Sequence, residues 1–146
     1  MQKLPHHYRV AAGAEASGNV LLSSDGAPDL LSAPPIEFGG PGDQWSPESL
    51  LVAAVADCFV LSFRAIARAS KFDWTSLKCE VDGTLDRIER VTQFTGFRVT
   101  ATLELASADD EAKALRLLEK AEQACLITNS LKAESHLEAH VRISGQ

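Results

Sequence analysis

The stretch that decides the fold runs from Ser46 to Ala69 and reads SPESLLVAAVADCFVLSFRAIARA. Its first residues are typical of a helix start: Ser46 suits the N-cap, Pro47 the first helical position, and Glu48 places a negative charge where the helix dipole favours it. The helical pattern continues to about Ala69, which gives a length of about 35 Å at about 1.5 Å per residue. Because residues 50–63 are apolar on nearly every side, the sequence predicts a buried central helix.

Short strands and turns precede this helix. Residues 7–12 and 18–23 read as two strands, and the Gly-bounded segment 13–18 is expected to turn between them, which predicts a hairpin. Residues 33–42 are too rich in proline and glycine for a regular helix or strand. We expect that segment to be a shaped loop leading into the helix.

Alternating apolar and polar residues follow the helix. The segments 74–86 and 90–105 each alternate with a period of two, which predicts two strands joined as a second hairpin. Acidic residues at 109–111 open a second helix, whose apolar positions continue to Cys125. A final strand is expected within residues 132–143.

The order hairpin, long helix, hairpin, helix, strand indicates the α+β class with mainly antiparallel sheet. A chain of 146 residues is expected to form a single domain, residues 1–146, with a core that needs no disulfide or metal. The net charge of −6 argues against a nucleic-acid partner, because binding phosphates requires clustered lysine and arginine.

The first residues of the chain lack the apolar region of a signal peptide. The most apolar run, residues 50–63, is shorter than a bilayer span and contains Asp57. We therefore expect a cytoplasmic protein with no membrane partner. In that reducing compartment, the cysteines at 58, 79 and 125 are expected to be catalytic, redox-sensing, metal-binding or simply buried, rather than a structural framework.

Two parts of the chain resemble the signature motifs of the OsmC/Ohr family, the osmotically inducible protein C-like and organic hydroperoxide resistance proteins. The first motif is long: PIEFGGPG at 35–42, WSPESL at 45–50 and AAVADCF at 53–59. The second, CLITNSL at 125–131, is short but falls where that family has its second catalytic cysteine. The resemblance implies an OsmC-like fold, with antiparallel sheets around a long buried helix, in an intertwined homodimer.

Members of this family reduce organic hydroperoxides, and to varying degrees hydrogen peroxide, at two sites on the dimer interface. By resemblance, Cys58 is the attacking thiol, Cys125 resolves it as a disulfide, and Glu48 is a carboxylate that organises the site. No cofactor is expected beyond an external dithiol reductant. The family's arginine in the N-terminal hairpin has no counterpart within residues 13–18, and Arg9 is the nearest substitute.

The chemistry explains why two cysteines are needed. A thiolate attacks the peroxide and becomes a sulfenic acid, and a second thiol condenses with it to form a disulfide. A free thiol is mostly protonated at neutral pH, so a nearby cation or donor should lower the pKa of Cys58. The apolar residues around Cys58 favour an alkyl or lipid hydroperoxide over hydrogen peroxide; they are Ala54, Val55, Phe59, Leu61 and Phe63.

Glu48 and Cys58 are ten residues apart on one predicted helix. That spacing corresponds to about 15 Å along the axis, so Glu48 cannot reach the thiol of its own helix. If Glu48 serves the site, it must come from a second copy, which agrees with a homodimer that has two identical sites.

Two other functions remain open. One is a non-catalytic dimeric module of the same fold that binds an apolar small molecule, an alternative kept open by the missing arginine and by Leu126. The other is a zinc protein, suggested only weakly by His136 and His140, which have helical ligand spacing on a predicted strand. Cys79 is expected to be a core residue of a strand.

Five further side chains have expected positions. Asp57 points about 100° away from Cys58 around the helix and is interpreted as structural. Arg64 and Arg68 are expected on the exposed later face of the helix. Trp45 and Phe38 either line the mouth of a pocket or anchor the loop.

Overall fold

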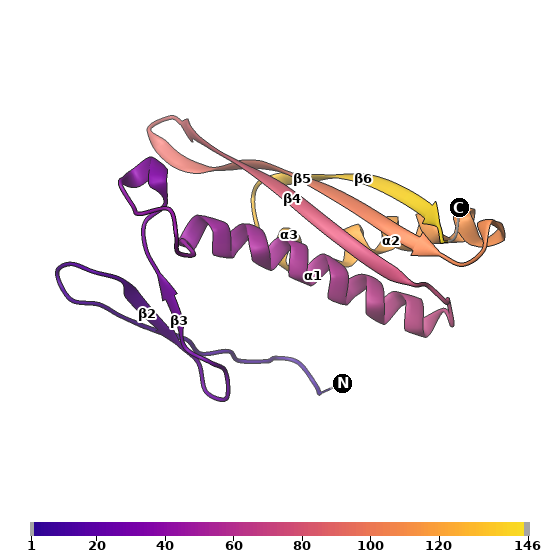
Figure 1. Cartoon of the computed structure of the whole chain (residues 1–146), viewed down its shortest axis with the longest axis horizontal. Helices are drawn as coiled ribbons and strands as arrows, with labels where there is room; N and C mark the ends of the chain where they lie inside the picture. The colour runs from indigo at the N-terminus through magenta and orange to yellow at the C-terminus, as the bar shows by residue number, and fades with distance from the viewer. Residues whose placement is uncertain (1, 145–146) are drawn as a thin grey trace. The chain divides into compact units, whose positions relative to one another are not determined.

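The computed structural model describes residues 2–144, and the chain forms two compact units, residues 1–51 and 52–146. The first unit contains a three-stranded sheet and a short 3₁₀ helix, and the second contains another three-stranded sheet and two further α-helices (Figure 1). Helix α1 (Pro47–Ala69) begins in the first unit and continues into the second. The α+β class is confirmed.

The first unit holds a three-stranded antiparallel sheet in the order β1-β2-β3. Its strands are β1 (Ala11–Gly13), β2 (Val20–Ser23) and β3 (Leu30–Ser32). The predicted hairpin is confirmed, although its first strand is shorter and lies later than residues 7–12. Strand β3 was not predicted, because three residues are too few to show a period.

Helix α1 starts where the sequence predicts. Ser46 and Ser49 form a reciprocal capping box: the Ser49 amide donates to the Ser46 hydroxyl at 3.1 Å, and the Ser46 amide donates to the Ser49 hydroxyl at 2.9 Å. Upstream of this cap, the Ala33 amide donates to the Trp45 carbonyl at 2.9 Å. These bonds fix the predicted shaped loop, which contains one turn of 3₁₀ helix at Ile36–Phe38.

The second unit holds a three-stranded sheet in the order β4-β5-β6. Strands β4 (Ser76–Ile88) and β5 (Val91–Leu105) form the predicted antiparallel hairpin. Their two-residue turn, Glu89 and Arg90, has φ values of 49° and 72°, as a type I′ turn requires. The sequence placed this turn a little early, because neither residue is the usual asparagine or glycine.

Strand β6 (Glu134–Ile143) runs parallel to β5, which corrects the expectation of antiparallel neighbours in this sheet. A parallel pair needs a crossover connection rather than a tight turn. Helices α2 (Glu111–Ala124) and α3 (Leu126–Asn129) lie between β5 and β6 in the chain and provide that crossover.

The core of the second unit lies between this sheet and the helices on one of its faces (Figure 1). Each element contributes one apolar stripe, and the buried side chains are Val55, Phe59, Phe63 and Ala67 of α1, Phe97, Val99, Ala101, Leu103 and Leu105 of β5, and Ala114, Leu117, Leu118 and Ala121 of α2. The predicted inward face of residues 97–105 is therefore confirmed. Gly83 of β4 is placed so that an added Cβ would lie 2.9 Å from the Val52 side chain.

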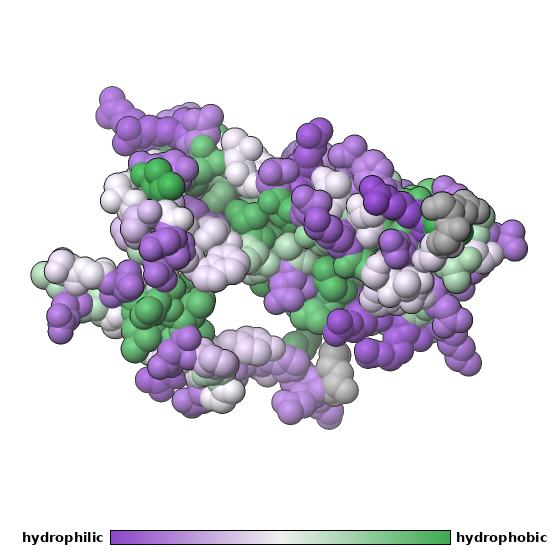
Figure 2. Space-filling model, in the orientation of Figure 1, coloured by the Kyte–Doolittle hydropathy of each residue, from purple (hydrophilic) through white to green (hydrophobic). Residues whose placement is uncertain are grey.

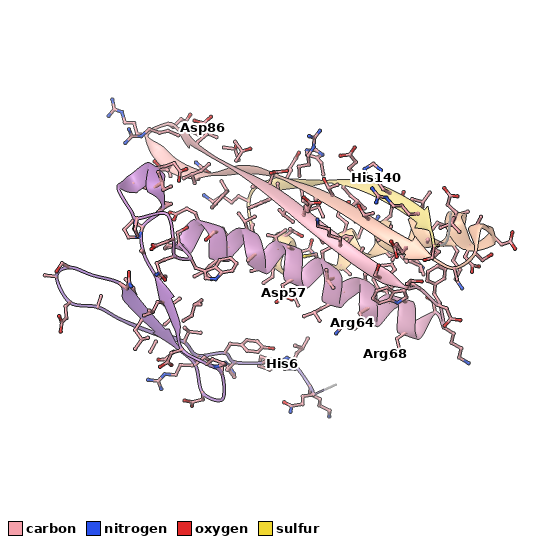
Figure 3. All side chains as sticks on the ribbon, viewed as in Figure 1. His6, Asp57, Arg64, Arg68, Asp86 and His140 are labelled. Carbon is pink, nitrogen blue, oxygen red and sulfur yellow. The ribbon has the colours of Figure 1, made fainter. Side chains whose placement is uncertain are left out.

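The prediction that α1 is buried all round is wrong for the single chain. Only its stripe toward the sheet is buried, while Leu61 is 50% exposed and apolar surface remains along the helix (Figure 2). By length and composition α1 could cross a membrane, because an 18-residue window within it has a mean hydropathy of 2.0, but a core helix of a soluble protein meets the same criteria. Arg64 and Arg68 project away from the sheet, as predicted, and so does Asp57 (Figure 3).

Candidate active site

Cys58 lies in the middle of α1 and is half-buried. The next residue, Phe59, is 1% exposed and packs into the core of the second unit, so the helix is held firmly at this point. The Cys58 thiol lies at the edge of that buried stripe. The Ser62 hydroxyl, one turn further along the helix, is 3.9 Å from the sulfur.

Cys125 does not lie within the second helix, as the sequence suggested, but at a break between α2 and α3. Its backbone is extended, with φ −65° and ψ 103°, and its side chain is 2% exposed. The Cys125 carbonyl accepts bonds from the Asn129 amide and the Thr128 hydroxyl, which start α3 directly after the break. A continuous helix would have no free amides here, since each N–H would bond to a carbonyl four residues earlier.

The structure brings Cys58 and Cys125 together, although they are far apart in the sequence. Burial raises the pKa of the Cys58 thiol. Four hydrogen-bond donors outweigh this effect and leave the pKa of Cys58 below its ordinary value: the backbone N–H of Ile127, the Cys125 side chain, the Ser62 hydroxyl and the backbone N–H of Leu126. Both thiols are free.

The sequence suggested that a nearby cation or donor would lower the pKa of Cys58, and the four groups that do so are uncharged donors. Two of them are the first backbone amides of α3, which have no carbonyl partner within the helix because they belong to its first turn. Nothing in the residue types at 126 and 127 marks them as donors, since every residue except proline has an amide N–H. This part of the site could not have been found from the sequence.

Cys79 lies on β4, on the side of the strand that faces the helices, and is only partly buried. Burial, with smaller contributions from the nearby Cys125 and Glu80, raises the pKa of Cys79 to about 11. The thiol therefore stays protonated at neutral pH and is a poor nucleophile. This agrees with its interpretation as a structural residue.

Glu48 lies in the first turn of α1, within the first unit. It contributes to the wall of an apolar cavity of about 420 Å³, and its Oε1 atom is buried without a hydrogen-bond partner among the described residues. Arg9, the proposed substitute for the family arginine, lines a different, polar hollow together with Asp25 and Asp29. Within one chain, Arg9 and Glu48 therefore line different hollows.

The remaining candidate residues lie at different places in the structure. Phe38 lines the apolar cavity, whereas Trp45 anchors the loop through its backbone bridge to Ser32. His136 and His140 are exposed on β6, each beside a glutamate of the same strand. Figure 3 shows His140 on the outer face of the sheet. Within residues 2–144, no group of three or more histidine, cysteine, aspartate or glutamate side chains is arranged to hold a metal ion.

One substitution tests the amide donors directly. We expect Leu126→Pro to raise the pH at which Cys58 becomes reactive, because losing the Leu126 N–H donor destabilises the thiolate. The alkylation of Cys58 at pH 7 should then be about threefold to tenfold slower than in the wild type. Proline suits the first position of a helix, and Cys125 already has the extended backbone that proline requires of the preceding residue. The measurement is the iodoacetamide alkylation rate of Cys58 against pH, followed by mass spectrometry.

Leu126→Ala is the matched control, because it loses the same side chain but keeps the amide. Its pH profile should match that of the wild type. If both variants shift equally, the side chain of Leu126 and not its N–H controls the thiolate.

Comparisons of the sequence with known proteins identify a matching family and several relatives. A family model described as OsmC-like protein matches residues 40–140 of the chain. The uncharacterized protein YmaD of Bacillus subtilis is 28% identical over 155 residues, covering 97% of this chain and 98% of YmaD. An organic hydroperoxide resistance protein of Xanthomonas axonopodis pv. citri is 32% identical over 114 residues, covering 76% of this chain and 77% of that protein.

Among solved structures, an OsmC-like protein of unknown function from Vibrio cholerae has a TM-score of 0.83 to this chain. The alignment covers 92% of this chain and 99% of the Vibrio protein, at 18% identity. At that identity the likeness bears on the fold alone. It matches an α+β arrangement of two small sheets and a long helix.

Proposed function

This chain belongs to the OsmC-like protein family, and we propose that it is a thiol-dependent peroxidase that reduces organic hydroperoxides. One observation carries the proposal: the Cys58 thiol has a lowered pKa, and a second thiol, Cys125, is one of the neighbouring groups that lower it. A structural cysteine needs neither feature. The organic hydroperoxide resistance protein from Xanthomonas, at 32% identity, supports the same chemistry.

The proposed reaction has three steps. The Cys58 thiolate attacks one peroxide oxygen, an S–O bond forms as the O–O bond breaks, and the alkoxide leaves as an alcohol after taking a proton. The Cys125 thiol then attacks the Cys58 sulfenic acid, forming a disulfide and releasing water. An external dithiol reduces this disulfide through two exchange steps and is itself oxidised to a disulfide.

The surface around Cys58 supports an alkyl substrate. Of the five apolar residues that suggested this preference, Val55, Phe59 and Phe63 are fully buried in the core and cannot contact a substrate. Ala54 and Leu61 remain, at four residues before and three residues after Cys58, and therefore on the same side of α1. The side chain of Leu126, 64% exposed beside the same site, adds to this apolar surface.

Purified protein supplied with dithiothreitol should consume cumene hydroperoxide with a kcat/KM at least about tenfold higher than for hydrogen peroxide, because apolar burial contributes only to binding the larger substrate. The assay follows the loss of each peroxide over time. Equal rates for the two peroxides would contradict the substrate preference. An absence of consumption of either would contradict the proposed activity itself.

We propose in addition that the active molecule is a homodimer in which Glu48 of one copy serves the Cys58 site of the other. Both residues lie on α1, ten residues apart along one helix, which corresponds to about 15 Å. The helix also leaves apolar side chains such as Leu61 exposed, and a second copy would cover them.

Mixing two inactive variants tests the shared site. In hybrids of Cys58→Ser with Glu48→Gln, one of the two sites receives an intact Cys58 and an intact Glu48, while the other receives neither. Random exchange of equal amounts should therefore restore about a quarter of the wild-type activity. The two unmixed variants serve as controls. Recovery that fails although hybrids form, or a Glu48→Gln protein as active as the wild type, would contradict the arrangement.

A second candidate function is a dimeric module that binds an apolar small molecule without turnover. The apolar cavity of about 420 Å³ beside Glu48 favours it, since that volume lies within the usual range of small-molecule sites. The peroxide assay separates the two candidates, because a binding module would not consume peroxide.

A further inference from the structure

The Ile127 amide, the largest of the contributions that lower the pKa of Cys58, belongs to a peptide group whose carbonyl is held by a hydroxyl. That carbonyl is the one of Leu126, and it accepts a hydrogen bond from the Ser130 hydroxyl at 2.7 Å. The Ser130 amide donates instead to the Ile127 carbonyl, at 3.0 Å. The Ser130 hydroxyl therefore takes the place that a backbone N–H four residues later has in a longer helix.

The preceding peptide group is held in the same way. Its Leu126 N–H also donates to the Cys58 sulfur. Its carbonyl, that of Cys125, accepts the Thr128 hydroxyl at 3.1 Å and the Asn129 amide at 3.0 Å. Each of these two consecutive peptide groups thus lies between a side-chain hydroxyl at its carbonyl end and the thiol at its N–H end.

This arrangement matters because a trans peptide group is planar, so that its C=O and its N–H point in opposite directions. A hydrogen bond that fixes the direction of the carbonyl therefore also fixes the direction of the N–H. A donor at the carbonyl also polarises the peptide group and makes its N–H a stronger donor. Helix α3 has only four residues and is too short to hold its amides in place without such support.

We propose that Ser130 and Thr128 are positioning residues of the thiol site, which orient the Ile127 and Leu126 amides toward Cys58 through the carbonyl of each peptide group. Neither hydroxyl is one of the four donors to the sulfur, so both act at one remove. The inference rests on the proposed function, in which Cys58 is the reacting thiol, and it adds the side chains that stabilise its thiolate.

Of the two hydroxyls, that of Ser130 should have the larger effect. The Leu126 carbonyl depends on this hydroxyl, because the Ser130 amide donates elsewhere. The Cys125 carbonyl, in contrast, keeps the bond from the Asn129 amide when the Thr128 hydroxyl is removed.

The pH dependence of Cys58 alkylation by iodoacetamide tests the proposal, with mass spectrometry of the Cys58 peptide as the readout. In Ser130→Ala the midpoint should rise by about half a pH unit, and alkylation at pH 7 should slow about threefold, because a less well oriented amide stabilises the thiolate less. Above the raised midpoint the rate should return to that of the wild type, since the thiolate is then fully formed. Thr128→Val should shift the midpoint in the same direction by a smaller amount.

The matched controls keep each hydroxyl and change the rest of the side chain. Ser130→Thr and Thr128→Ser should retain the wild-type profile. The Cys125 thiol, the other titratable group that affects the pKa of Cys58, is present in every variant. Circular dichroism checks that the variants fold.

Three outcomes would overturn the proposal. A wild-type profile in Ser130→Ala would mean that its hydroxyl does not orient the Ile127 amide. A shift in Ser130→Thr as large as that in Ser130→Ala would assign the effect to side-chain size. An equal loss of rate at every pH would indicate a structural role only. Alkylation needs no peroxide, so a wild-type protein that fails to reduce peroxides would contradict the proposed function and not this result.

Discussion

Replacing Cys58 by serine is expected to lower peroxidase activity by at least about a thousandfold, to the level of the buffer alone. The Cys58 sulfur is the nucleophile of the proposed reaction, and the donors around it act by stabilising its thiolate. A serine hydroxyl in the same place stays protonated and does not break the O–O bond. The measurement is the initial rate of cumene hydroperoxide loss with excess dithiothreitol.

Cys79→Ser is the matched control for this experiment. Its thiol has a pKa raised to about 11, so it contributes little thiolate at neutral pH, and the variant should keep most of the wild-type rate. Circular dichroism and thermal melting of both variants confirm that they fold. Undiminished activity in Cys58→Ser would reject Cys58 as the attacking thiol. A large loss of activity in Cys79→Ser alone would indicate that Cys79 of β4 is the attacking thiol instead.

Replacing Cys125 by serine is expected to leave the first attack intact and to prevent the disulfide that follows. Without a resolving thiol, the Cys58 sulfenic acid remains exposed to further peroxide and is oxidised to the sulfinic acid, which dithiols do not reduce. In excess peroxide, sustained turnover should fall at least about tenfold relative to the wild type. The serine hydroxyl can still donate to the Cys58 sulfur, so the rate of the first attack should stay close to that of the wild type.

Intact-mass spectrometry after peroxide treatment, with no reductant present, follows this difference. The wild type should lose the mass of two hydrogens as the disulfide forms, whereas Cys125→Ser should gain the mass of two oxygens, about 32 mass units. A Cys125→Ser protein that keeps turning over and gains no oxygen would show that another group resolves the sulfenic acid. Peptide mapping then identifies whether Cys79 is that group.

The sequence predicts much of the fold because its local signals are strong. Ser46 and Pro47 mark the start of α1, and the structure places the capping box at this position. The alternation over residues 97–105 predicts which face of β5 is buried. The sequence does not show that β6 runs parallel to β5, because a period of two identifies a strand but not its neighbour's direction.

The extent of burial along α1 was also overestimated from the sequence. An apolar residue indicates that burial is favourable, but it does not identify what covers it. Within the single chain, Val55 and Phe59 are buried against the sheet while Leu61 remains half exposed. An apolar helix can be covered by its own chain, by a second copy or by another partner, and only packing distinguishes these cases.

For the candidate site, the sequence by itself determined the chemistry available: thiols at 58 and 125 within motifs that resemble those of the OsmC/Ohr family, and a carboxylate at 48 in a helix's first turn. Only the tertiary structure decided that the two thiols meet, because they are brought together by the packing of α1 against the break between α2 and α3. It also decided what activates Cys58. Backbone amides, which every residue but proline has, become donors to one sulfur only when the chain folds them toward it.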